Sequence, residues 1–92
     1  MIATFKNKAL SDLWRKGGSS KIDSRLFARI LRRLDALNVA SRPEDMDIPG
    51  FDFHSLTGFN PIRYTVHVNG PWCVTFAFAS GNAEDVEFEQ YH

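Results

Sequence analysis

The spacing of apolar residues changes once along this chain, near Phe51. Before that point they recur every three or four residues, as on one face of a helix, and after it they alternate with polar residues, as in a strand. A chain of 92 residues has room for one small core. We therefore predict a single domain, residues 1–92, with an α+β fold in which two N-terminal helices pack on one face of a largely antiparallel sheet.

The first half of the chain contains two expected helices. Asn7 is placed to cap the first, and Gly17-Gly18 would end it; its apolar face carries Leu10, Leu13 and Trp14. The second would begin at Asp23 or Ser24. Its apolar stripe consists of Phe27, Ile30, Leu31, Leu34 and Leu37. This stripe gives the helix one side to bury against the sheet.

Strands are expected before and after the helices. Residues 2–5 read as a short first strand. After Phe51 the chain reads FDFHSL, IRYTVHV, WCVTFAFA and EDVEFEQYH, with turn signals at residues 69–71 and 80–82. Alternation assigns Ile62, Val66 and the other apolar residues to the core. The opposite face would be an open polar surface that carries Arg63, Thr65, His67, Cys73, Thr75, Glu87 and Glu89.

The charges are divided between the two halves of the chain, although the formal net charge is zero. Residues 1–42 contain ten Lys and Arg against three Asp, whereas residues 43–92 contain Arg63 against eight acids. We expect the basic half to face phosphates, because phosphate contacts supply most non-specific affinity for nucleic acids. The candidate contacts are Lys6, Lys8 and a ridge opposite the apolar stripe, made of Arg25, Arg29, Arg32 and Arg33. The alternative is a set of solvated helix faces.

Other classes of protein lack support in the sequence. The chain has no apolar run long enough for a signal peptide or a membrane span, so we expect a cytoplasmic protein without membrane contacts. Cys73 is the single cysteine, which excludes an internal disulfide and a cysteine-based zinc site. No HxH or HxxH spacing occurs, so neither a metal nor a cofactor is indicated.

Two histidines at expected strand ends, His54 and His92, suggest acid–base chemistry. Cleavage of RNA without a metal needs a base for the 2′-hydroxyl, an acid for the departing 5′-oxygen, and a cation for the phosphorane. The two imidazoles would supply base and acid. Tyr91 would donate to the phosphate or stack on a base, and Arg63 would neutralise charge. The alternatives are a capping role for His54, a solvated strand residue at His67, and a disordered tail.

Four stretches of the sequence together resemble one known family. They are MIATFKNKALSDLWRKG, FHSLTG, YTVHVNGPWCVTFAF and the terminal EQYH. Spread over the whole chain, they resemble the HigB group of bacterial toxins, within the RelE/ParE toxin superfamily. The resemblance implies a compact α+β fold like that of microbial ribonucleases. It also implies a toxin that cleaves mRNA in the ribosomal A site and is inhibited by a HigA-type helix-turn-helix antitoxin, with operator DNA contacted only through that antitoxin.

The resemblance also assigns residues to the site. His54 matches the family's histidine in H-x-L-x-G, and Tyr91 with His92 matches its C-terminal pair. The basic surface, with His67 as a further candidate, would then face ribosomal RNA. Arg63 and His67 are candidate replacements for two cations that members of the family often carry.

Three positions depart from the family's pattern. Family members often have lysine where this chain has Thr57, arginine where it has Cys73, and an acid where it has Gln90. Two alternatives to the endoribonuclease therefore stay open at this point. One is a weakened toxin that acts as co-repressor with its antitoxin, and the other is an inhibitor of DNA gyrase like the ParE branch.

Overall fold

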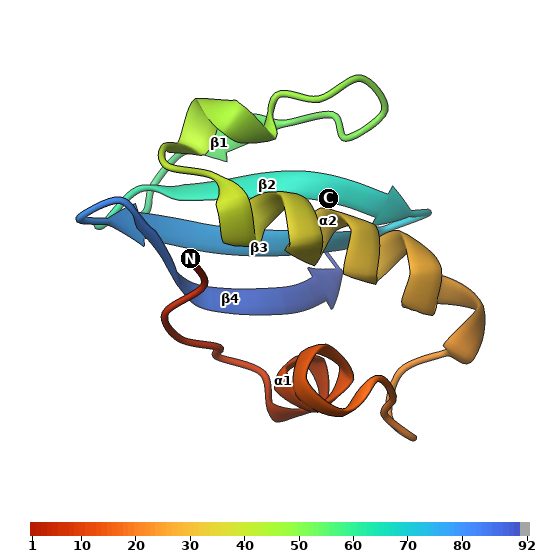
Figure 1. Ribbon diagram of the computed structural model, residues 1–92. Coiled ribbons are helices and arrows are strands. Elements are labelled where there is room, and N and C mark those ends of the chain that lie inside the picture. The colour runs from red at the N-terminus through yellow and green to blue at the C-terminus, as the bar shows by residue number, and fades with distance from the viewer. Residues whose placement is uncertain (91–92) are drawn as a thin grey trace.

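The computed structural model describes residues 1–90 of the chain. Two α-helices, α1 (Lys8–Lys16) and α2 (Phe27–Val39), precede a four-stranded sheet (Figure 1). The strands are β1 (His54–Leu56), β2 (Arg63–Asn69), β3 (Trp72–Ala79) and β4 (Asn82–Gln90), and two 3-10 helices, η1 (Ser24–Leu26) and η2 (Pro43–Met46), flank α2. Neighbouring strands are antiparallel in the order β1-β2-β3-β4. The predicted α+β fold is confirmed.

Local sequence signals set the ends of the helices. The Asn7 side chain accepts a hydrogen bond from the Leu10 backbone N–H at 3.1 Å and so caps α1. Gly17, at φ 83°, ends α1 in the left-handed region that favours glycine. The Asp23 side chain caps η1 by accepting from the Arg25 backbone N–H. The predicted start of the second helix is therefore correct, except that its first turn is a 3-10 turn.

The core lies between α2 and one face of the sheet. Figure 1 shows α2 crossing in front of the strands, with α1 beside β4 at the lower edge of the sheet. Ile30, Leu34 and Leu37 on α2 are fully buried, as are Val74 and Phe76 on β3. Burying one such side chain contributes about 1.5–3 kcal/mol. This face of the sheet holds the fold together and leaves the other face for polar side chains.

Residues 2–5 do not form the predicted strand. They run alongside β4 in parallel and make two isolated bridges, Ile2 with Ala83 and Phe5 with Val86. The backbone bonds include Ala3 N–H to the Ala83 carbonyl at 2.7 Å and Lys6 N–H to the Val86 carbonyl at 2.9 Å. The pairing is interrupted because β4 is irregular at this point.

The irregularity in β4 is a bulge at Asp85. Ala83 and Val86 are both fully buried, yet they are three residues apart, and strict alternation would place them on opposite faces. One extra residue resolves this conflict: the pairing of β3 with β4 shifts in register there, and Asp85 takes a positive φ of 50°. The Asp85 N–H is bound by the Thr4 side chain at 2.9 Å.

Two face assignments from the alternation are wrong. Ile62 precedes β2 and is 54% exposed, so it does not belong to the core. The polar face is also not open, because Thr65, Cys73 and Thr75 are all buried. The polar side chains of this face bond to one another across the strands, and that bonding creates the candidate site.

Candidate active site and cationic surface

One row of polar residues crosses all four strands of the sheet. His54 pairs with Thr65, Thr65 with Thr75, and Thr75 with Glu87, and directly paired residues in an antiparallel sheet point to the same side. Thr65 Oγ1 is buried and has no hydrogen-bond partner among residues 1–90. β1 and β4 stand at the two ends of this row, separated by three strand spacings or about 14 Å.

His54 begins β1 and is exposed to solvent. Its Nδ1 lies 3.0 Å from the Asp52 backbone carbonyl. Because a carbonyl only accepts hydrogen bonds, Nδ1 must donate, and the Nε2 lone pair of the neutral ring remains free. Asp52 has a positive φ of 49°, which turns the chain just before the strand. This local bend presents an oriented imidazole that can accept a proton at Nε2.

Arg63 begins β2 and already has partners on the polar face. Its Nη2 donates to Thr75 Oγ1 at 3.1 Å and to the Asp85 backbone carbonyl at 2.8 Å. Thr75 in turn donates to the Glu89 carboxylate. Arg63 forms no direct ion pair among the described residues, whose ion pairs involve other side chains. Its guanidinium therefore stays available to an anion at the cost of rearranging these neutral contacts.

Two of the predicted catalytic residues, Tyr91 and His92, lie outside the described residues. Gln90 directly precedes them and pairs with Trp72 at the end of the β3–β4 ladder. The Trp72 ring stacks on Phe88, with 4.7 Å between ring centroids. An aromatic pair thus joins β3 to β4 two residues before the last described residue.

The positions that depart from the family's pattern supply no charge. Cys73 is buried and lies between His67 and Glu89 in the strand pairing. Thr57 is exposed just after β1, and Gln90 is exposed at the end of β4. His67, a proposed replacement, is tied to the β2–β3 turn, because its Nε2 donates to the Gly70 carbonyl at 2.9 Å. Arg63 is therefore the permanent cation that the described residues place on the polar face.

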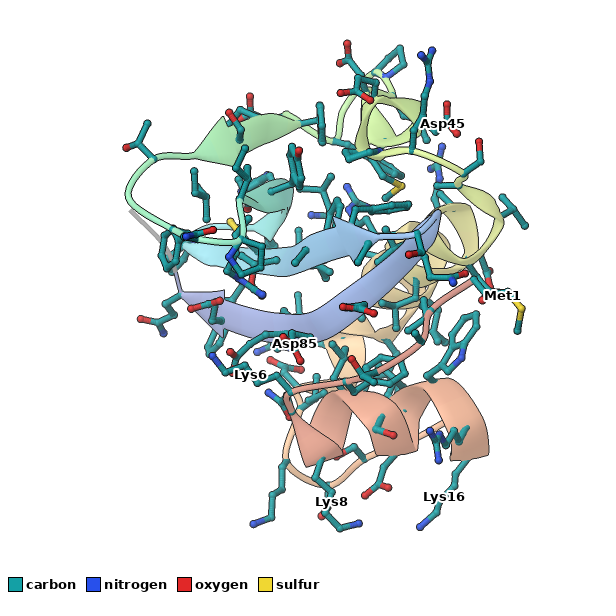
Figure 2. All side chains as sticks on the ribbon, turned by 90° about the vertical axis from the view of Figure 1, so that its left-hand side faces the viewer. Met1, Lys6, Lys8, Lys16, Asp45 and Asp85 are labelled. Carbon is teal, nitrogen blue, oxygen red and sulfur yellow. The ribbon has the colours of Figure 1, made fainter. Side chains whose placement is uncertain are left out.

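The basic residues of the first half do not all share one surface, and the ridge predicted from Arg25, Arg29, Arg32 and Arg33 loses Arg33, which is buried. Arg25 lies in η1 and binds Asp23 at 2.8 Å, and this hydrogen bond lowers the pKa of Asp23 to about 2. Lys8 and Lys16 both contact Asp12 on the outer side of α1, and Figure 2 shows them projecting away from the sheet. Lys6 is exposed between α1 and the bridges to β4. The cations therefore divide into separate groups.

Arg33 does not lie on the exposed side of α2, so its predicted placement is wrong. It is 8% exposed, and its guanidinium packs 4.5 Å from the centre of the Phe51 ring. Its Nε donates to the His67 carbonyl at 2.8 Å, and its Nη1 donates to the Arg29 carbonyl at 3.1 Å. Burial, and then repulsion by Arg32 and Arg29, lowers the pKa of Arg33.

A hollow of about 420 Å³ opens beside this buried arginine. It is lined by Ala28, Arg29, Arg32, Arg33, Gly50, His67 and Val68. Arg29 reaches across from α2 to Asn69 Oδ1 at 3.3 Å and to the Val68 carbonyl at 3.4 Å. Sequence reasoning missed this hollow, although Arg33 lies three residues after Ile30 and four before Leu37, a spacing that indicates the buried side of the helix.

Two kinds of feature are absent from residues 1–90. No helix is both long and apolar enough to cross a membrane. No three His, Cys, Asp or Glu side chains gather within this part of the chain in a way that could hold a metal ion.

Comparison with known proteins agrees with the fold. Residues 3–92 match the family model of HigB-like toxins, described as RelE-like toxins of type II toxin–antitoxin systems. The chain is also 32% identical to the endoribonuclease HigB of Proteus vulgaris, over the full length of both chains. Members of such systems act with a cognate antitoxin. This chain therefore belongs to the HigB-like family of RelE-like toxins.

Proposed function

We propose that this toxin is a ribosome-dependent endoribonuclease that cleaves translated mRNA in the ribosomal A site without a metal ion and so arrests growth. The observation that carries the proposal is the exposed His54, whose Nδ1 is bound to the Asp52 carbonyl and whose Nε2 is free. The Proteus vulgaris relative is named an endoribonuclease. That name agrees with a site built around an oriented imidazole.

His54 is the general base in this proposal. Its free Nε2 takes the proton from the 2′-hydroxyl, and the 2′-oxygen then attacks the adjacent phosphorus. The bond from phosphorus to the 5′-oxygen breaks, leaving a 2′,3′-cyclic phosphate. His92 protonates the departing 5′-oxygen as the general acid, and Tyr91 orients the phosphate. Arg63 neutralises the charge that develops on the phosphorane oxygens.

The basic half of the chain would hold the toxin on the ribosome. Lys6, Lys8, Arg25, Arg29, Arg32 and His67 are proposed to contact ribosomal RNA, with Arg33 acting from inside the hollow. The lysines and arginines among them are supported by the charge split and by their exposure, because phosphate contacts supply affinity that does not depend on sequence. The antitoxin is proposed to be of the HigA helix-turn-helix type, and operator DNA would be reached only through it.

A second candidate function rests on the neutral residues in the site. Thr57, Cys73 and Gln90 supply no charge, and Arg63 is already bonded to Thr75 and Asp85. A toxin with this site would cleave weakly and serve mainly as co-repressor with its antitoxin. The gyrase-inhibitor alternative has no comparable observation in its favour.

Mapping of 5′ ends on a reporter mRNA tests the proposal. The chain is induced without antitoxin beside His54→Ala, His92→Ala and the matched control Ser55→Ala, whose side chain lies next to His54 on the opposite face of β1. We expect new ends at in-frame positions only when the message is translated. His54→Ala should lower cleavage by about 10²- to 10⁴-fold, the usual contribution of one acid–base group, and Ser55→Ala should cleave as the parent does.

Other outcomes separate the candidates. Cleavage that persists in His54→Ala would remove the proposed base. Intact message with growth arrest and a DNA-damage response would favour gyrase as the target. Intact message without arrest, combined with altered operator binding by the antitoxin, would favour the co-repressor.

A further inference from the structure

The hollow beside α2 contains a cation that is both buried and unpaired. Arg33 is more than nine-tenths buried, but the ion pairs among residues 1–90 do not include it. Its Nε and Nη1 are used by two backbone carbonyls, while Nη2 donates no hydrogen bond within the described part of the chain. A buried charge without a counter-charge is costly, because desolvation is then not offset by attraction.

The surroundings of Arg33 increase this cost. Arg29 and Arg32 line the same hollow and repel Arg33. Among residues 1–90, no acidic residue lines the hollow, and Gly50 in its lining contributes no side chain. Three arginines therefore line one open hollow. Attraction for an anion in this space is stronger than on open surface, because low-dielectric walls reduce screening.

We propose that this hollow is a phosphate-binding subsite, which takes the phosphate ester of a nucleotide unit and holds it between Arg29, Arg32 and Arg33. Phosphate fits better than carboxylate, because its oxygens point in several directions and accept from several guanidiniums, whereas one planar fork satisfies a carboxylate. The volume of about 420 Å³ lies within the usual range of small-ligand sites, roughly 300–1,000 Å³. It leaves room for the sugar that carries the phosphate.

The subsite is separate from the candidate active site. Arg33 reaches the sheet from α2, on the core side, whereas His54 and Arg63 belong to the opposite, polar face. An occupied subsite therefore leaves the polar face free. The subsite adds a specific phosphate contact to the proposed docking to RNA. It rests on that proposal only in taking RNA as the source of the phosphate. The free chain should bind phosphate in the absence of any ribosome.

The test is a titration of the purified full chain, in phosphate-free buffer, with inorganic phosphate and with a 2′-O-methyl oligoribonucleotide that cannot be cleaved. Binding is followed by calorimetry and by the NMR shifts of backbone amides. We expect saturable shifts at Arg29, Arg33, Gly50 and Val68. Arg32→Gln should weaken binding by about 10-fold or more, since it removes one charged hydrogen-bond donor. Arg32 is exposed and donates no hydrogen bond within residues 1–90, so this variant keeps the fold.

Arg15→Gln is the matched control, because Arg15 is an exposed arginine on α1 and does not line the hollow. It should bind as the parent does. Equal weakening by both substitutions, or shifts spread over all basic residues without saturation, would overturn the subsite. A glutamate-rich peptide that shifts these amides where phosphate does not would assign the hollow to an acidic protein partner instead.

Two further comparisons identify the source of the phosphate and test the subsite independently of the proposed function. Tighter binding of the oligoribonucleotide than of inorganic phosphate would identify RNA as the source, and equal binding would identify a free phosphate or nucleotide. The titration is repeated on His54→Ala, which should bind as the parent does. Phosphate binding by a parent chain that cleaves no message would overturn the proposed function and leave the subsite intact.

Discussion

Arg63 at the start of β2 donates a hydrogen bond of 2.8 Å to the backbone carbonyl of Asp85, the extra residue in β4. β3 lies between these two strands, so the bond spans the full width of one strand. The bulge removes this carbonyl from the regular β3–β4 ladder. One side chain therefore satisfies a backbone irregularity and also supplies the proposed phosphate ligand.

Replacement of Arg63 should lower stability as well as activity. Arg63→Met removes two hydrogen bonds and leaves the Asp85 carbonyl without this donor, so we expect a loss of about 1–3 kcal/mol in the free energy of unfolding. Urea unfolding measures this loss. Arg15→Met on the surface of α1 is the control and should change stability by less than about 0.5 kcal/mol. An unchanged midpoint for Arg63→Met would show that the bulge does not depend on this bond.

The charge of Glu89 should restrain Arg63. Glu89 accepts from Thr75, which in turn accepts from Arg63, so the carboxylate would oppose the proposed binding of an RNA phosphate by Arg63. Glu89→Gln should raise RNA cleavage or RNA affinity by about 5-fold, near 1 kcal/mol for one charge at a surface site. The control is Glu87→Gln, which removes an equal charge from the same face. Equal increases for both variants would indicate a general field effect.

Two adjacent arginines should differ in how much the same substitution changes stability. Arg33→Met removes the donor to the His67 carbonyl and the contact with Phe51, so we expect a loss of about 1–3 kcal/mol. Arg32 lies on the exposed side of α2, so Arg32→Met should change the free energy of unfolding by less than about 0.5 kcal/mol. Chemical denaturation compares the two. Similar values for both would contradict the burial of Arg33.

Asn7 should contribute twice to stability. Its side-chain oxygen caps α1, while its nitrogen donates to the Phe88 carbonyl on β4 at 3.3 Å. Asn7→Asp keeps the cap but loses the donor, so we expect a loss of about 0.5–1.5 kcal/mol. Asn7→Ala loses both contacts and should cost about 1 kcal/mol more. Thermal unfolding ranks the three proteins, and equal stability of the two variants would show that the cap contributes nothing.

The contribution of the Asp23 cap at η1 to stability should persist at acidic pH. Arg25 lowers the pKa of Asp23 from 3.8 to about 2, so the pair stabilises the fold above the ordinary pKa, and this contribution is lost as the pH falls through about 2. Asp23→Asn should therefore lower the unfolding midpoint at neutral pH. It should also flatten the pH dependence of stability between about pH 4 and pH 2. An unchanged slope of stability against pH would show that the Asp23–Arg25 pair does not contribute to this pH dependence.

Local signals in the sequence predicted the helices well. Asn7, Gly17 and Asp23 act on backbone groups within four residues of themselves, so their roles follow from short-range geometry alone. The strand order after Phe51 followed from alternation and from turn signals in the same way. His54 was expected where the chain leaves a strand, whereas it is the first residue of β1.

Features that depend on distant segments were predicted poorly. Residues 2–5 form two isolated bridges to β4 and not the expected strand, because β4 carries a bulge. Thr75 is buried, and its side chain forms hydrogen bonds with Arg63 and Glu89 on the two neighbouring strands. Alternation within one strand does not reveal such contacts. Arg33 is different, because its spacing from Ile30 already indicated the buried side of α2. The prediction placed Arg33 on the exposed side of α2 because arginine is charged, although its position in the helix indicated burial.

The pairing of the N-terminal segment with β4 also bears on when the toxin becomes active. Thr4 binds the Asp85 N–H and Asn7 binds the Phe88 carbonyl, in both cases 81 residues further along the chain. A nascent chain cannot close this edge until β4 has been synthesised and has emerged from the exit tunnel. Contacts of such long range form late. A ribosome translating this message would therefore finish β4 before its own product could fold completely.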